Sequence, residues 1–127
     1  MEKVYEFLKK CGTFYLATMD GNQPRVRPFG AIEVFENKLY IITGKVKNVS
    51  KQMEANPKIE ISGMADGKWI RIEAEAIDDD RLEARQYMLS AYPSLEGMYK
   101  ADDGNMQVLY LKNVKATISC FTEAPVV

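Results

Sequence analysis

The chain opens with apolar residues that recur at helical spacing. These residues are Val4, Phe7, Leu8 and Cys11. Because they are three or four positions apart, they would share one face of an α-helix. Gly12 follows directly, and glycine commonly ends helices because it adopts a positive φ without strain. We therefore expect a short amphipathic helix that ends at Gly12.

Runs rich in β-branched and aromatic residues fill most of the remaining chain, as is typical of strands bounded by turns. The predicted strands cover residues 13–19, 25–35, 39–43, 59–64, 69–77, 107–111 and 116–121. Asp20-Gly21-Asn22 is a hairpin signal between the first two strands, and a turn near Asn113 separates the last two. Pro28 and Gly30 weaken the second strand and indicate an edge, a bulge or close approach by a ligand.

The run at 69–77 alternates strictly between two sets of side chains. One set is Ile70, Ile72, Ala74 and Ala76, and the other is Trp69, Arg71, Glu73 and Glu75. Successive side chains of a strand point to opposite faces of a sheet. The first set is therefore expected to face a core, and the second to face water or a partner subunit.

Helical segments are expected between some of these strands. Residues 51–55 form one that Asn56-Pro57 stops, because proline disfavours helical geometry in the residue before it. Asp80 and Glu83 have the spacing of a capping box and would start a helix that ends before Pro93. Residues 94–100 would add a turn of helix.

Short strands joined by hairpins, with only a few helices interposed, favour a barrel over an alternating α/β sheet. We predict a mainly β fold with a few helices, in which six or seven antiparallel strands form a closed or partly closed barrel. The chain has 127 residues, the usual size of one domain, so residues 1–127 are expected to form a single domain.

Composition and charge exclude some classes of function. The formal net charge is −1 and the basic residues are spread along the chain, so no basic field is available for nucleic acid. No apolar run is long enough for a membrane span, and the first residues lack the apolar stretch of a signal peptide. We expect a cytoplasmic protein that binds neither nucleic acid nor membrane.

The residue types that commonly act in catalysis or bind metals indicate a bound cofactor. Histidine is absent, which removes the commonest general base and the usual haem and zinc ligand. Cys11 and Cys120 fit neither a disulfide framework nor a zinc-ligand spacing, so we expect free thiols and no metal site. No catalytic residue is assigned, because reactive chemistry would come from a bound cofactor.

The first candidate binding segment is Arg25-Val26-Arg27-Pro28, just after the first hairpin. In a strand, Arg25 and Arg27 project to the same side, and guanidinium groups suit a phosphate or the carbonyl-rich edge of a heterocycle. The alternative is a pair of solvated arginines on an exposed face.

The second candidate is Thr43-Gly44-Lys45-Val46-Lys47-Asn48-Val49-Ser50-Lys51, between a strand and a helix. Its glycine, hydroxyls, amide and three lysines would offer donors and a positive helix dipole to an anion such as phosphate. The glycine spacing and the Lys-Ser/Thr pair of a Walker loop are missing. A lysine-rich surface turn is the alternative.

The order and spacing of several segments carry a resemblance to a known family. These are Arg25-Val26-Arg27-Pro28-Phe29-Gly30, Leu39-Tyr40-Ile41-Ile42-Thr43-Gly44, Lys51, Asn56-Pro57 and Trp69-Ile70-Arg71-Ile72-Glu73-Ala74-Glu75-Ala76. Over residues 10–80 they resemble the pyridoxamine 5'-phosphate oxidase-like split-barrel flavoproteins. The stretch from Tyr92-Pro93-Ser94-Leu95 through Tyr99 to Tyr110-Leu111 is similar to a small bacterial branch of that superfamily.

The resemblance implies a split β-barrel that binds FMN non-covalently at the interface of a homodimer. By position, the isoalloxazine and ribityl chain would be lined by Arg25, Val26, Arg27 and Pro28. The ribityl chain and phosphate would be held by Thr43, Gly44, Asn48 and Lys51. Oxidases of the family carry a basic pair shortly before the helix, where this chain has Asn48-Val49, so Lys45 or Lys47 are substitutes for Lys51 as phosphate ligand.

Two further segments are candidates for the same site. Trp69 and Arg71 lie on the outward face of their predicted strand and would contact the flavin of the partner subunit. The alternative for Trp69 is packing within the dimer interface. Tyr99 and the loop at 102–104 would cover the pocket.

The expected function is an FMN-dependent oxidoreductase acting on a small-molecule substrate with NAD(P)H as donor. Authentic pyridoxamine phosphate oxidase activity is disfavoured, because that enzyme's C-terminal substrate-binding segment, which includes a histidine, has no counterpart here. The missing histidine also disfavours the haem-degrading relatives. The alternatives are a non-enzymatic electron carrier or redox sensor, a deazaflavin-dependent enzyme and a ligand-free interaction module.

Overall fold

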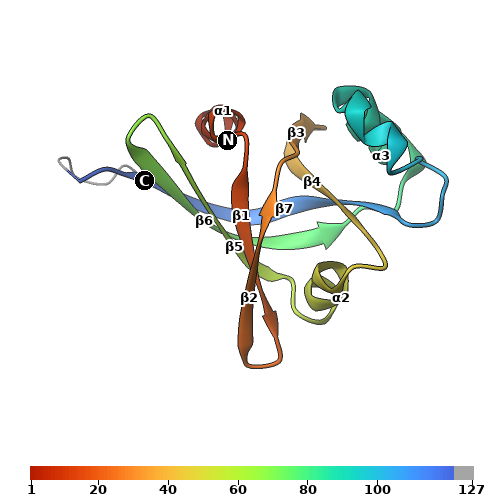
Figure 1. Cartoon of the computed structure of the whole chain (residues 1–127), viewed down its shortest axis with the longest axis horizontal. Helices are drawn as coiled ribbons and strands as arrows, with labels where there is room; N and C mark the ends of the chain where they lie inside the picture. The colour runs from red at the N-terminus through yellow and green to blue at the C-terminus, as the bar shows by residue number, and fades with distance from the viewer. Residues whose placement is uncertain (122–127) are drawn as a thin grey trace.

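The chain forms a curved antiparallel sheet with helices at its margins (Figure 1). The computed structural model describes residues 1–121, so residues 122–127 of the expected domain lie outside the described part. In chain order the described elements are α1 (Glu2–Cys11), β1 (Phe14–Asp20), β2 (Gln23–Phe29), β3 (Ile32–Phe35), β4 (Lys38–Gly44), α2 (Asn48–Ala55), β5 (Lys58–Ala65), β6 (Lys68–Asp78), α3 (Leu82–Ala91), the 3-10 helix η1 (Pro93–Gly97) and β7 (Met106–Ser119).

Seven strands of residues 1–121 make one sheet in the order β2-β1-β5-β6-β7-β4-β3, and every pair is antiparallel. The two edge strands, β2 and β3, follow one another in the sequence and do not pair with each other within the described residues. The curved sheet is therefore split instead of closed. This arrangement confirms the predicted mainly β split barrel of six or seven antiparallel strands, with seven observed among the described residues.

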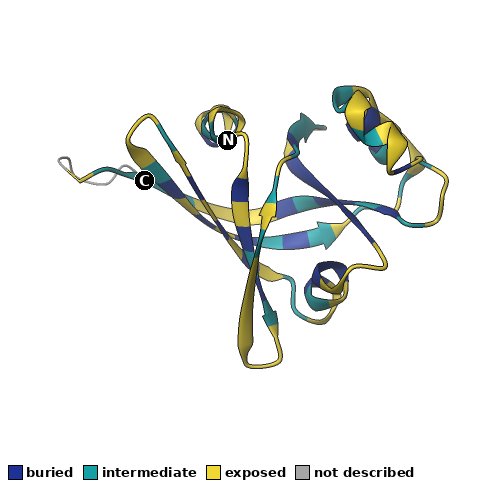
Figure 2. Ribbon diagram, viewed as in Figure 1, coloured by how far each residue is buried: buried dark blue, intermediate teal, exposed yellow. Residues whose placement is uncertain are grey.

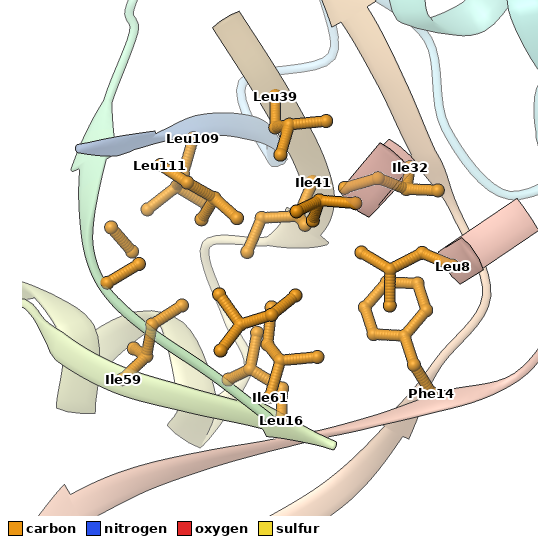
Figure 3. Close-up of a cluster of buried hydrophobic side chains, with 14 of the residues drawn as sticks. Leu8, Phe14, Leu16, Ile32, Leu39, Ile41, Ile59, Ile61, Leu109 and Leu111 are labelled. Carbon is orange, nitrogen blue, oxygen red and sulfur yellow. The ribbon is translucent and has the colours of Figure 1, made fainter. Parts of the chain in front are cut away.

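The main core fills the inside of the curve. Figure 3 shows Leu8 of α1 and Phe14 of β1 pointing toward side chains of β3, β4, β5 and β7. A second cluster packs β4 and β7 against α3 around Tyr40, Met88 and Val108, each of which is fully buried. In Figure 2 the buried positions form bands along the central strands, and the outer tip of the β1–β2 hairpin is exposed. Each fully buried aliphatic side chain contributes roughly 1.5–3 kcal/mol.

Several local predictions are confirmed. α1 ends at Gly12, whose φ of 70° lies in the left-handed region. The β1–β2 hairpin forms at the expected turn, with Asp20 opposite Gln23. β6 alternates as predicted, with Ile70 and Ile72 completely buried. The sequence pattern thus identified the inward face of the central strand.

Two strand predictions were wrong. The predicted strand at 25–35 is two strands, because the chain leaves the β1 edge after Phe29 and joins β4 from Ile32 onward. The predicted turn near Asn113 is a β-bulge within the continuous β7, opposite the register shift between Glu73 and Glu75. Asn113 takes a φ of 56°, and its side-chain amide donates a hydrogen bond to Glu75 over 2.5 Å. The residue that indicated a turn therefore forms a bulge, and the strand continues past it.

Two helix boundaries also differ from the prediction. The capping box at Asp80 and Glu83 does not form, because Arg81 is the N-cap and Asp80 instead accepts a hydrogen bond from Arg85 Nη1 over 2.9 Å. α2 begins at Asn48, before the predicted start at residue 51. No helix within residues 1–121 is long and apolar enough to cross a membrane.

Candidate functional site

A cavity of about 340 Å³ lies beside the split of the barrel, and we call it the cleft. Its walls come from the β2–β3 junction, the end of β4, the start of α2 and the segment around η1. The lining residues are Arg27, Pro28, Phe29, Gly30, Ala31, Ile42, Thr43, Lys47, Val49, Tyr92, Ser94, Leu95, Met98 and Tyr99. None of these is acidic, so the cleft combines an apolar lining with two cations.

The structure brings three of the residues expected at the flavin site together in the cleft. Arg27 and Pro28 come from β2, and the buried Thr43 comes from β4. Lys47, named from the sequence as a substitute phosphate ligand, lines the same cleft. The two segments singled out in the sequence thus meet across the split.

The other expected residues lie outside the cleft. Asn48 and Lys51 line a separate hollow of about 330 Å³ between α2 and the β1–β2 hairpin. Lys45 borders a third hollow beside α3, with Nζ 3.9 Å from Asp80 Oδ1. Gly44 is buried and does not line the cleft.

Arg25, Val26 and Trp69 are also separated from the cleft. Arg25 is an exposed residue whose Nε lies 3.4 Å from Asp20 Oδ2, and Val26 is 69% exposed. Trp69 lies on β6, where its ring packs against Phe121 with centroids 4.9 Å apart. A contact between Trp69 and a flavin would therefore have to involve a second copy of the chain.

The guanidinium of Arg27 is held by neutral acceptors. Its Nη1 donates to Thr18 Oγ1 over 2.8 Å and to the carbonyl of Leu16 over 3.1 Å, and its Nη2 donates to Gln52 Oε1 over 2.8 Å. The Thr18 hydroxyl donates to the same Gln52 oxygen over 2.6 Å. Because α2 packs against β1, Gln52 reaches across and fixes the orientation of Arg27.

Arg27 is also the one arginine without a carboxylate partner among the described residues. The chain has five arginines, and the other four pair with acidic side chains. Burial, followed by the nearby charge of Arg25, lowers the pKa of the Arg27 guanidinium. A partly buried cation with only neutral partners costs free energy, so its position beside a cavity favours an anionic or electron-rich ligand.

The N-terminus of α2 adds further donors at the mouth of the cleft. Lys47 is the N-cap, and no side chain caps the helix. The N–H groups of Asn48 and Val49 have no hydrogen-bond partner among the described residues, and the first turn contains no acid. Free N–H groups, the helix dipole and the Lys47 ammonium together suit a phosphate group.

The loop at 44–47 is held in place by Asn105. The carbonyl of Asn105 accepts from Lys45 N over 2.7 Å, and its side-chain oxygen accepts from Val46 N over 3.1 Å. A Cβ on Gly44 would lie 3.0 Å from Asn105 Nδ2 and 3.2 Å from the Tyr99 hydroxyl oxygen. Gly44 thus lets the segment after η1 approach the loop that leads into α2.

Sequence reasoning missed the residues that act through tertiary contacts. Thr18 and Gln52 were not singled out, because nothing in a local pattern indicates that they meet the Arg27 side chain. Asn105 was not singled out either. No group of three or more His, Cys, Asp or Glu side chains within residues 1–121 is arranged to hold a metal ion.

Comparison with protein families identifies the class to which this split barrel belongs. The family model described as pyridoxamine 5'-phosphate oxidase matches residues 1–120. The chain therefore belongs to the pyridoxamine 5'-phosphate oxidase-like family, as its sequence motifs indicated.

Solved structures agree with this assignment. A NimC/NimA family protein from Clostridium acetobutylicum is 51% identical with a TM-score of 0.95, and the match covers 98% of this chain and 91% of that one. General stress protein 26 from Bacillus anthracis shares the fold at 18% identity and a TM-score of 0.76, covering 98% and 95%. A protein from Mesorhizobium loti described as FAD-binding shares it at 14% identity and a TM-score of 0.68, covering 93% and 94%. No curated protein gives a significant match.

Proposed function

We propose that the protein is a homodimeric FMN-binding oxidoreductase that acts on a small-molecule substrate, with NAD(P)H as the electron donor. The observation that carries this proposal is the acid-free cleft, in which Arg27 and Lys47 face an otherwise mostly apolar lining. A flavin combines an apolar ring system with carbonyl oxygens and an anionic tail, which matches this distribution of groups.

The residues present fit the parts of FMN. Lys47 and the free N–H groups of Asn48 and Val49 would hold the phosphate, with Lys51 and Lys45 supplying positive charge from the adjoining hollows. Arg27 would face the electron-rich edge of the ring, oriented by Gln52. One phosphate site at one helix N-terminus suits a mononucleotide. The relative described as FAD-binding supports a flavin as the ligand class.

When bound, the flavin supplies the redox chemistry by accepting a hydride or single electrons. The protein then needs to bind the cofactor, orient its ring and admit a substrate. This division of labour agrees with a chain that has no histidine and with a cleft that has no acidic lining residue.

The dimer is supported by an exposed apolar face on the outside of the sheet. Tyr15 is 51% exposed, Val26 69% and Met64 64%, and the strand register places all three on one face together with Trp69. Exposed apolar patches on small proteins commonly mark interfaces. Pro28 lines the cleft and lies opposite Tyr15 in the register, so this face begins at the edge of the cleft. A partner's Trp69 would thereby reach the flavin.

Flavin titration tests the proposal. Purified apoprotein is titrated with FMN and with riboflavin, and binding is followed by quenching of flavin fluorescence. We expect FMN to bind more tightly than riboflavin. Lys47→Ala should weaken FMN on the order of 10- to 100-fold, the effect of losing a hydrogen bond to a charged group, and leave riboflavin nearly unchanged.

Two matched variants and a negative result complete the test. Lys51→Ala should have a smaller effect than Lys47→Ala, because Lys51 lies in the adjoining hollow, and Lys10→Ala, at the surface beside Asp66, should have none. A preparation that binds neither flavin would overturn the proposal. Flavin binding without turnover of any acceptor would favour an electron carrier.

A further inference from the structure

Two side-chain hydroxyl groups line the cleft and have no hydrogen-bond partner among the described residues. Tyr99 is 5% exposed and Thr43 is 3% exposed, and both line the cleft. No fully buried side-chain nitrogen or oxygen atom among the described residues lacks a hydrogen-bond partner, so these two hydroxyl oxygens are open to the cavity. Both hydroxyls are therefore available to a ligand that binds in the cleft.

The Tyr99 hydroxyl is placed at the tail end of the proposed flavin site. It lies 3.2 Å from the position that a Cβ on Gly44 would occupy, directly before the loop that leads to the N-terminus of α2. Because that N-terminus offers the phosphate site, the oxygen atoms nearest to Tyr99 would be those of the ribityl-phosphate tail. A larger residue at position 44 would displace the hydroxyl.

A hydrogen-bonded turn directly follows Tyr99. Asp103 accepts hydrogen bonds from the backbone N–H groups of Lys100, Asn105 and Met106 over 2.9, 2.7 and 2.7 Å. These bonds, led by the one from Lys100, lower the pKa of Asp103. The turn presents Asn105 to the loop at 44–47 and leaves Tyr99 facing the cleft.

Resting on the proposed function, we propose that Tyr99 is a ligand-binding residue whose hydroxyl donates a hydrogen bond to the ribityl-phosphate tail of the flavin. Thr43 supplies the second hydroxyl on the same wall. The segment from Tyr99 to Met106 is then part of the binding site, and it distinguishes flavins by their tails instead of their rings. Neutral hydrogen bonds of this kind change affinity on the order of 2- to 10-fold.

The experiment compares Tyr99→Phe with the wild type in binding three flavins. FMN has the full tail, riboflavin lacks the phosphate, and lumiflavin has the ring system without the ribityl chain. We expect Tyr99→Phe to weaken FMN about 5-fold and leave lumiflavin unchanged. Riboflavin binding locates the contact. If the acceptor is a ribityl oxygen, the variant loses affinity for riboflavin as well as for FMN, and if it is a phosphate oxygen, the affinity for riboflavin is unchanged.

Controls separate this inference from the proposed function. Tyr87→Phe, at a residue that packs against Phe35 and does not line the cleft, should bind all three flavins like the wild type. Thermal unfolding of Tyr99→Phe shows that the ring still packs. If the wild type binds no flavin, the proposed function fails. If it binds FMN and Tyr99→Phe binds FMN equally well, or loses lumiflavin by the same factor, the role of Tyr99 alone is overturned.

Discussion

At the scale of single residues, Arg27 is the side chain whose environment most favours the binding of a ligand. Its guanidinium is partly buried, and Thr18, Leu16 and Gln52 offer it only neutral oxygens. Neutral acceptors orient the group without cancelling its charge. The cleft therefore keeps a fixed positive potential, which would strengthen binding of an electron-rich ring or an anion.

Replacing Gln52 tests this use of the charge. Gln52→Glu places a carboxylate on Arg27, so we expect the apoprotein to become as stable as the wild type or more stable, and FMN to bind on the order of 10-fold more weakly. Urea unfolding and flavin titration measure the two quantities on the same variant. Gln52→Leu removes the acceptor instead and should lower the free energy of unfolding by about 1–3 kcal/mol. Unchanged FMN affinity in Gln52→Glu would show that the charge of Arg27 does not contribute to FMN binding.

The two arginines of β2 show how far a residue can be predicted from sequence. Period-2 geometry placed Arg25 and Arg27 on one side of the strand, which the register confirms. Their different roles depend on neighbours from distant segments: Arg25 meets Asp20 at the hairpin, whereas Arg27 meets Gln52 of α2. Family resemblance found the segment, but tertiary contacts decide which arginine faces the cleft.

At the scale of elements, a polar cluster ties the β3–β4 turn to the end of β6 and the start of α3. The Tyr40 hydroxyl donates to Asp79 Oδ2 over 2.6 Å. Arg81 Nη2 donates to the same carboxylate oxygen over 2.8 Å and to Glu36 Oε1 over 2.6 Å. Hydrogen bonds from Arg81, with a smaller contribution from Tyr40, lower the pKa of Asp79 to about 2.

This shift predicts how stability depends on pH. The folded pKa of Asp79 is below the unfolded value of 3.8, so its contribution is complete above pH 5 and disappears as the pH falls toward 2. Asp79→Asn should therefore lower the free energy of unfolding by roughly 2 kcal/mol at pH 7 and by much less near pH 2. Urea unfolding at the two pH values measures the difference. An equal loss at both would assign the effect to packing.

Element boundaries were predictable where a local signal acts alone. Gly12 ended α1 and the Asp20-Gly21-Asn22 turn closed the first hairpin as expected. The sequence indicated at Gly30 only a weak point within one strand. The pairing of β3 with β4 shows instead that the chain passes here from one edge of the sheet to the other. The bulge at Asn113 likewise needs the long partner strand β6 to continue past it.

At the scale of the whole molecule, the split sheet has two surfaces with different roles. The inner surface is closed by the core in Figure 3, and the cleft opens where β2 and β3 separate. The outer surface carries the exposed apolar patch of Tyr15, Val26 and Met64, and the half-buried Trp69 lies on the same face. The number of strands and the barrel class were predictable from patterning and resemblance, whereas this division depends on the register, which sequence alone did not provide.

The outer patch yields the last prediction, a test of the homodimer. Val26→Lys combined with Met64→Lys places two charges on the patch, and burying them in an interface without partners would cost several kcal/mol, enough to dissociate a dimer of ordinary affinity. Sedimentation equilibrium should show the wild type at twice the chain mass and the double variant at the chain mass. Val46→Lys is the matched control, since Val46 is 72% exposed but lies on the loop before α2, so its mass should equal that of the wild type. A wild type at the mass of one chain would overturn the homodimer, and a double variant that remains dimeric would place the interface elsewhere. Either result would remove the route by which a partner's Trp69 reaches the flavin.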